Sequence, residues 1–269
     1  MENNISTKIR VIGNNFNERD EDGNIKVNIA YINKGNMTAK EAKEQIRKVE
    51  EYAKQAILLE NVSNLATIDN GNTFDRIKKE LRKCGYKVYA SELNASDYGI
   101  PQQRKRLYIV AFRKDLGVKN YRFPKLVALQ KYVKDILEPE ESIDEKKYLY
   151  DLSFVCKGNP DYYSNSPVKL GIIGKGGQGE RVYSINGTAI TVTAKSGGKF
   201  RNTGGNYIDD KLRRLTVREC ARLMGFPDSF QLNCSETQAY KLLGNSVVVD
   251  VIEYILISMA EALKKVDAI

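Results

Sequence analysis

The chain has 269 residues, and its 43 Lys and Arg residues outnumber its 34 Asp and Glu residues, so its formal net charge is +9. This excess favours a polyanionic partner such as nucleic acid. The absence of histidine excludes imidazole acid–base catalysis and zinc sites with histidine ligands, and no metal site is expected.

The N-terminal segment, residues 1–36, contains clusters of Asn, Asp and Gly around two short apolar stretches, at 9–12 and 27–32. The two stretches are compatible with a loose hairpin, and the segment is assigned to no domain. A capping box formed by Thr38 and Glu41 then predicts the start of a helix.

Helical and strand patterns alternate in the next part of the chain. An apolar run predicts a strand at 56–59, and apolar residues three and four apart predict a helix over 74–84 that ends at Gly85. Two further strands are predicted at 87–93 and 107–112. This alternation is typical of an α/β sheet.

The pattern changes between residues 135 and 212, where short β-like segments and turn residues predict a small, mostly β insert. Helical patterns return at 216–224 and from Asn245 onward. The sequence therefore predicts a discontinuous α/β domain, formed by residues 37–134 and 213–269, with the small domain inserted at 135–212. The apolar run near the C-terminus is interrupted by acidic residues, so we expect a buried helix and no membrane span.

Four short motifs carry the functional signal of the chain. An acid at the tip of an apolar strand and two arginines two residues apart suit the binding of a polar heterocycle and its phosphate. The acid would donate or share a proton, and the arginines would bind oxygens. Alone, the acid would be interpreted as a surface residue. The motifs are Glu60-Asn61-Val62, Tyr98–Arg106, Arg218–Pro227 and Gly244–Val247. In this order, and from Glu44 to Val266, the chain resembles the later motifs of the bacterial cytosine-5 DNA methyltransferases.

The resemblance implies a partial Rossmann-like, doubly wound methyltransferase sheet with an inserted target recognition domain, acting on double-stranded DNA in restriction-modification. It implies that Glu60 and Arg106 contact a cytosine flipped out of the duplex, because the reacting carbon is inaccessible inside a stacked helix. Arg104 would hold the neighbourhood of the catalytic loop. Asn245 and Ser246 would line the pocket for S-adenosylmethionine, and a helix N-cap also explains these two residue types.

A glycine-rich segment, Gly174–Ser184, lies in a basic part of the chain. Nine basic and three acidic residues between 167 and 214 give a net charge of 9 − 3 = +6. A flexible turn is one interpretation of the glycines. The segment also resembles the target recognition domain of the family, which implies that Gln178 fills the gap left by the flipped base and that Arg181 reads a guanine.

The same resemblance implies a GCGC-like target site. Thr191 and Gly198 would support contact with the DNA. Lys195 stands where one bacterial member of the family has an aromatic base contact, which leaves the sequence preference of this chain open.

The nucleophile of the family is missing. Cytosine-5 methylation needs a thiolate, which the family supplies from a Pro-Cys pair ahead of the Glu-Asn-Val motif. None of the six prolines here precedes a cysteine, the first cysteine is Cys84, and the Phe-x-Gly-x-Gly cofactor loop of the family is also absent. The four cysteines show no Cys-x-x-Cys spacing, and the sequence shows no signal peptide. We therefore expect reduced thiols in a cytoplasmic protein.

Two hypotheses follow. In the first, the chain is a component or truncated form of a cytosine-5 DNA methyltransferase, inactive alone and dependent on a protein partner with the cofactor loop and the catalytic Pro-Cys. In the second, it is a non-catalytic DNA-binding remnant or regulator. The base-pocket residues favour the first, since a pure DNA binder has no use for them. A partial sheet would also leave a strand edge open, because residues 1–36 have little apolar periodicity to cover it.

Overall fold

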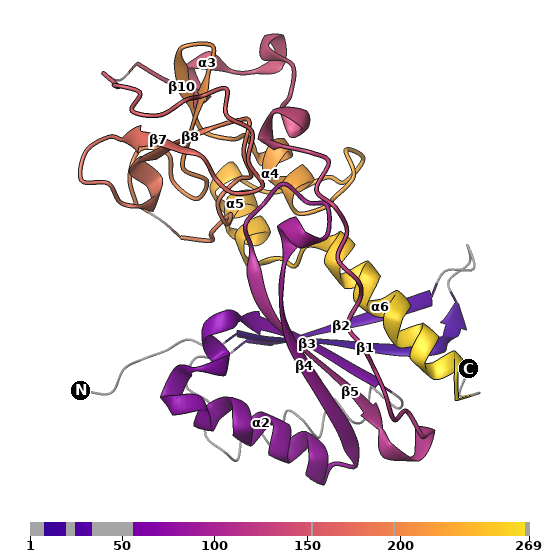
Figure 1. Ribbon diagram of the computed structural model, residues 1–269. Helices are drawn as coiled ribbons and strands as arrows, with labels where there is room; N and C mark the ends of the chain where they lie inside the picture. Colours follow the sequence, from indigo (N-terminus) through magenta and orange to yellow (C-terminus); the bar gives the residue numbers. More distant parts are fainter. Residues whose placement is uncertain (1–7, 20–24, 34–55, 152, 196, 267–269) are drawn as a thin grey trace. The chain divides into compact units, whose positions relative to one another are not determined.

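The structure is a computed structural model (Figure 1). It describes residues 8–19, 25–33, 56–151, 153–195 and 197–266. The helix predicted to begin at Thr38 lies outside the described residues. The chain forms two compact units. Unit 1 comprises residues 1–93, 105–124 and 254–269, and unit 2 comprises residues 94–104 and 125–253.

Unit 1 is built on a five-stranded sheet with the strand order β2-β1-β3-β5-β4. The strands are β1 (Lys8–Arg19), β2 (Ile25–Asn33), β3 (Ala56–Val62), β4 (Tyr86–Asn94) and β5 (Lys105–Arg113). The predicted strands at 56–59, 87–93 and 107–112 are thereby confirmed. The pairs β1–β2, β1–β3 and β3–β5 are antiparallel, whereas neighbouring strands of a doubly wound sheet are parallel. The short connection between β1 and β2 permits only an antiparallel pair.

The hairpin expected in the N-terminal segment is present, and it covers the sheet edge that was expected to be open. β1 pairs with β3 from Arg10 opposite Glu60 to Asn14 opposite Ala56. The expectation that residues 1–36 leave this edge uncovered is therefore wrong. Backbone hydrogen bonds between strands need no apolar periodicity, which is why the sequence pattern did not indicate this pairing.

Helix α2 (Asn72–Lys83) covers one face of this sheet, as Figure 1 shows. Its Ile77 and Leu81 pack against apolar side chains of the strands, including Ile57 and Leu59 of β3. Burial of such a side chain contributes about 1.5–3 kcal/mol. The helix ends before Gly85, whose φ of +87° is the left-handed conformation that favours glycine.

Helix α6 (Val249–Lys264) belongs to the opposite face. The ring of Phe112 lies 5.3 Å from that of Tyr121, whose hydroxyl is 2.9 Å from Ser258 Oγ of α6. Successive strand residues point to alternate faces, so Glu60 lies on the face opposite Leu59 and α2. Within the described residues, no helix has the length and apolar character needed to cross a membrane.

Unit 2 contains a second five-stranded sheet with the order β6-β10-β9-β8-β7. Its strands are β6 (Leu149–Tyr150), β7 (Lys169–Ile172), β8 (Arg181–Ser184), β9 (Gly205–Ile208) and β10 (Lys211–Arg213). β8 and β9 are parallel, and the other pairs are antiparallel. Leu170, Val182, Phe200 and Leu212 form the buried apolar cluster of this sheet.

Three short α-helices complete unit 2, namely α3 (Glu145–Tyr148), α4 (Val217–Leu223) and α5 (Glu236–Asn245). The helix predicted at 216–224 is confirmed. Helix α5 was not predicted; Ser235 caps it by accepting a hydrogen bond from the Gln238 amide at 3.4 Å. Asn245 is the last residue of α5, so the interpretation of Asn245 and Ser246 as an N-cap is wrong. Short 3₁₀ turns lie at Ser63–Ala66, Ile68–Gly71, Ala95–Asp97, Lys114–Leu116, Val133–Ile136, Glu140–Ser142 and Gln178–Glu180.

A buried charge network fixes the start of α4. Glu219 is fully buried, and its carboxylate accepts hydrogen bonds from Arg213 Nη1 at 2.8 Å and Nη2 at 2.6 Å. The backbone amides of Glu138 and Thr216 donate to the same carboxylate at 2.9 and 2.8 Å. Every donor that faces this carboxylate therefore helps to offset the cost of burying its charge.

Candidate functional site

Glu60 and Arg106 form a largely buried ion pair in unit 1. Glu60 Oε1 lies 3.1 Å from Arg106 Nε, and the two side chains are 6% and 14% exposed. Both residues lie near the end of β3 at which the Glu-Asn-Val motif stands, since Arg106 is in register with Val62. A carboxylate and a guanidinium at one strand end can accept a hydrogen bond from a polar ring and donate to its oxygen.

Arg104 is buried in unit 2, where its guanidinium binds backbone carbonyls. Nη1 donates to Val192 O at 2.9 Å, and Nη2 donates to Gly244 O at 3.1 Å and Ser246 O at 2.6 Å. The planar fork of donors thus ties the segment at 192 to the end of α5. This geometry is that of a positioning residue.

Gln102 is a site residue that the sequence analysis did not select. It is fully buried; its Nε2 donates to Leu223 O at 2.8 Å, and its Oε1 accepts from the Val192 amide at 3.1 Å. Thr191 Oγ1 donates to Gln103 O at 2.6 Å, so the segments 101–104 and 189–192 are joined at several points. A glutamine that lies between Pro101 and Arg104 forms no sequence pattern from which the buried contacts of Gln102 could be predicted.

Two glycine-containing loops meet backbone to backbone beside these segments. The Phe200 amide donates to Gly179 O at 2.8 Å. A Cβ on Gly179 would lie 2.1 Å from Gly197 O, and one on Gly198 would lie 2.6 Å from Gly179 O. Gly198 also has a φ of +90°. These positions need glycine for close packing, so the interpretation of the segment as merely a flexible turn is wrong for Gly179.

The residues predicted to contact DNA lie around these loops. Gln178 Nε2 donates to Thr191 O at 3.2 Å, and Gly198 contacts Gly179. Arg181 is exposed at the start of β8, where its Nε donates to Gly176 O at 3.1 Å. All four predicted DNA-contact residues therefore belong to unit 2.

Asn245 and Ser246 lie at the C-terminal end of α5, and both are half-buried. The Ser246 amide donates to Leu243 O at 3.0 Å, and its carbonyl accepts from Arg104. The two residues thus belong to the contacts that Arg104 organises.

The environment of Cys220 differs from that of a nucleophile. Cys220 is fully buried, and this burial, together with the Glu219 carboxylate, raises its pKa well above the ordinary value. A neutral thiol does not attack, because the thiolate is the nucleophile. Among the described residues, no cluster of three or more Cys, Asp and Glu side chains could hold a metal ion.

Comparisons with known proteins point to the same family as the sequence motifs. The sequence model of the C-5 cytosine-specific DNA methylases matches residues 33–261. Type II methyltransferase M.HhaI of Haemophilus parahaemolyticus is 44% identical over 219 residues, 81% of this chain and 66% of that protein. Type II methyltransferase M.HaeII of Haemophilus aegyptius is 38% identical over 216 residues, 78% of this chain and 62% of that protein.

The chain therefore spans less than two thirds of the length of these relatives. Among solved structures, the S. pombe Dnmt2 methyltransferase is similar with a TM-score of 0.58 and 22% identity, over 84% of this chain and 72% of that chain. At this identity the likeness concerns the fold, which is a mixed α/β fold related to that of methyltransferases.

Proposed function

The chain belongs to the family of C-5 cytosine-specific DNA methylases, and from this premise we propose that it is one component of a type II cytosine-5 DNA methyltransferase. In this proposal the chain supplies the contacts to the flipped cytosine and the recognition of the target in double-stranded DNA. The observation that carries the proposal is the buried Glu60–Arg106 ion pair, with its 3.1 Å separation. A protein that only binds DNA has no need for such a pair.

The roles of the pair follow from its chemistry. Glu60 accepts a hydrogen bond from the polar edge of the extruded base, or shares a proton with it, as the ring is attacked. Arg106 donates to the oxygen of the same base and holds the carboxylate in place. Arg104 acts through the segments that it ties together, so it positions the site and does not touch the base.

Target recognition is proposed for residues 135–212, and residues 37–134 with 213–269 are proposed to form part of the catalytic domain. Gln178 and Arg181 would face the bases, with Thr191 and Gly198 shaping the loops that carry them. Support comes from the tight packing of these loops, because side chains on a fixed backbone can discriminate base edges. GCGC-like sites are the proposed targets.

S-adenosylmethionine supplies the methyl group in this family, and the residues of this chain are not sufficient to hold it. Ser246 uses its carbonyl for Arg104, and Asn245 ends helix α5. The sequence also contains no Phe-x-Gly-x-Gly loop. We therefore propose that a protein partner completes the cofactor site and brings the Pro-Cys nucleophile.

The test is complementation in trans. The purified chain, incubated with labelled S-adenosylmethionine and a GCGC duplex, should transfer no label above background. Co-expression with the part of M.HhaI that this chain does not match should restore transfer. Specific transfer by the chain alone would refute the need for a partner, and DNA binding without any complementation would favour the alternative of a non-catalytic remnant or regulator.

A further inference from the structure

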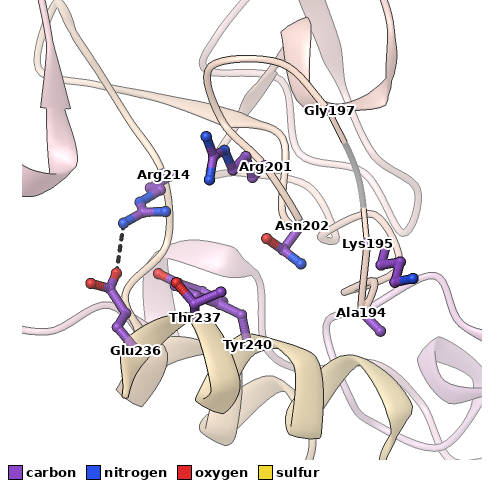
Figure 2. Close-up of a pocket in the computed structure, with 9 residues that line it drawn as sticks. All are labelled: Ala194, Lys195, Gly197, Arg201, Asn202, Arg214, Glu236, Thr237 and Tyr240. Carbon is purple, nitrogen blue, oxygen red and sulfur yellow. Dashed lines mark hydrogen bonds and ion pairs between the residues drawn. The ribbon is translucent and has the colours of Figure 1, made fainter.

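Unit 2 contains a cavity of about 450 Å³ that none of the assigned roles explains. This volume lies within the range of ligand sites in proteins. Figure 2 shows Arg201, Arg214 and Asn202 extending toward the space above the first turns of α5. The cavity is lined by Ala194, Lys195, Gly197, Arg201, Asn202, Arg214, Glu236, Thr237 and Tyr240.

The cavity carries positive charge. Three cationic side chains and one carboxylate line it, so the formal charge of the lining is 3 − 1 = +2. The carboxylate, Glu236, is already held by two cations: Arg214 Nη2 and Lys147 Nζ each lie 2.6 Å from one of its oxygens. Lys195 and Arg201 are exposed, and neither forms an ion pair with any residue that the structure describes. An anion is therefore the ligand that the lining favours.

Arg214 is fixed in its place. Its guanidinium carbon lies 5.2 Å from the Tyr148 ring centroid and 5.1 Å from that of Tyr240. Cation–π contacts of this kind, added to the ion pair with Glu236, hold the guanidinium in one orientation. Thr237 lies in the first turn of α5, where the helix dipole adds to the positive potential.

We propose that this cavity holds a backbone phosphate, with its deoxyribose, of the duplex DNA that the neighbouring loops recognise. The inference rests on the proposed function and names a contact within it. Gly197 lines the cavity and contacts Gly179, which follows Gln178 in the chain. A phosphate held here fixes the register of the duplex relative to Gln178 and Arg181, since phosphate contacts position a protein on DNA and base contacts specify the sequence.

In this proposal, Lys195 has a role in DNA binding that does not depend on the DNA sequence. Its side chain lines the cavity together with that of Arg201. An ammonium group suits a phosphate, because it acts as a point charge.

The test is DNA binding by the full chain over a range of salt concentrations, on a GCGC duplex and on a random duplex. Arg201→Ala and Lys195→Ala should each weaken both complexes equally, by about threefold to tenfold, and should lower the slope of log K against log salt by about one. Lys157→Ala is the matched control, because Lys157 is an exposed lysine of the same unit outside the cavity, and it should change neither quantity.

A second arm locates the phosphate. Single neutral methylphosphonate linkages placed along the GCGC duplex should weaken binding by the wild type at one or two positions, and Arg201→Ala should be insensitive there. If Arg201→Ala is as sensitive to these methylphosphonate linkages as the wild type, the inference is overturned. It is also overturned if Arg201→Ala and Lys157→Ala have the same DNA affinity and the same salt slope. Neither result would affect the proposed function. No DNA binding by the wild type would refute both proposals.

Discussion

Glu60 and Arg106 pair diagonally across two antiparallel strands. The register places Glu60 opposite Tyr108 and Arg106 opposite Val62, yet Glu60 Oε1 lies 3.1 Å from Arg106 Nε. Residues two positions apart in register share one face of a sheet, and long side chains reach across that distance. The carboxylate and the guanidinium are therefore set by the strand pairing, on the face opposite α2.

Glu60→Gln should abolish turnover in the complemented complex and leave its assembly and DNA binding intact. The amide keeps the shape of the side chain but cannot take a proton, and general acid–base contributions are about 10²–10⁴-fold. The measurement is single-turnover methyl transfer. Glu92→Gln is the control, because Glu92 is an exposed acid whose nearest ion-pair contact, with Lys105, is 3.8 Å long. Normal methylation by the Glu60→Gln complex would show that the assignment of Glu60 is wrong.

The cysteines should react with iodoacetamide at very different rates. Burial raises the pKa of Cys220, so at pH 8 its thiol stays protonated, and the fraction of thiolate increases only as the pH approaches that raised value. Cys234 is exposed and should be labelled first. Mass spectrometry of the alkylated native chain would measure both rates. Rapid labelling of Cys220 in the folded chain would contradict the buried placement.

Glu219→Gln should destabilise unit 2 by about 3–5 kcal/mol, because removing one charge of a buried pair leaves the other, on Arg213, without its counterion. Urea unfolding of the two proteins would measure this difference. Glu145→Gln serves as the control, since Glu145 is 67% exposed and its contact with Lys211 is 3.9 Å long. Similar unfolding midpoints for the two variants would contradict the role of the network.

Gly179→Ala should destabilise the packing of the two loops by about 1–3 kcal/mol, because the new methyl group would overlap a backbone oxygen that cannot move away cheaply. Gly177→Ala, two residues earlier, is the control: its Cβ would meet only Glu180 Oε2, at 3.6 Å. Thermal unfolding should separate the two variants. Equal stability would mean that the loops are more loosely packed than the 2.1 Å approach to Gly197 O indicates.

The sequence predicted those structural features that depend on the pattern of residues close together in the chain. Strands β3, β4 and β5 and helix α2 follow from apolar periodicity and a terminal glycine. Glu60 was selected because its place at a strand end is combined with the arginine pair and with Asn245-Ser246. The Glu60–Arg106 contact could not be derived in this way, because it depends on the register between two strands. Gln102 was missed for the same reason: its partners Val192 and Leu223 are distant in the sequence.

The N-terminal hairpin gives the last prediction, because β1 lies on the edge of β3 where a strand from a partner would otherwise pair. Deletion of residues 1–33 should expose the backbone groups of β3 and promote self-association, which light scattering would detect. Deletion of residues 1–7, which leaves both strands in the chain, should not have this effect.

The same deletion shows where a complementing fragment binds. If the fragment replaces the hairpin, the deletion of 1–33 should increase its affinity, since no strand has to be displaced before the new pair forms. If the fragment pairs at β2, the deletion should abolish binding, because that edge is lost with the hairpin. Calorimetry can distinguish replacement of the hairpin from pairing at β2, by measuring the affinity of the fragment for the full chain and for the deletion variant. An unchanged affinity would show that the partner does not join the sheet at the hairpin side.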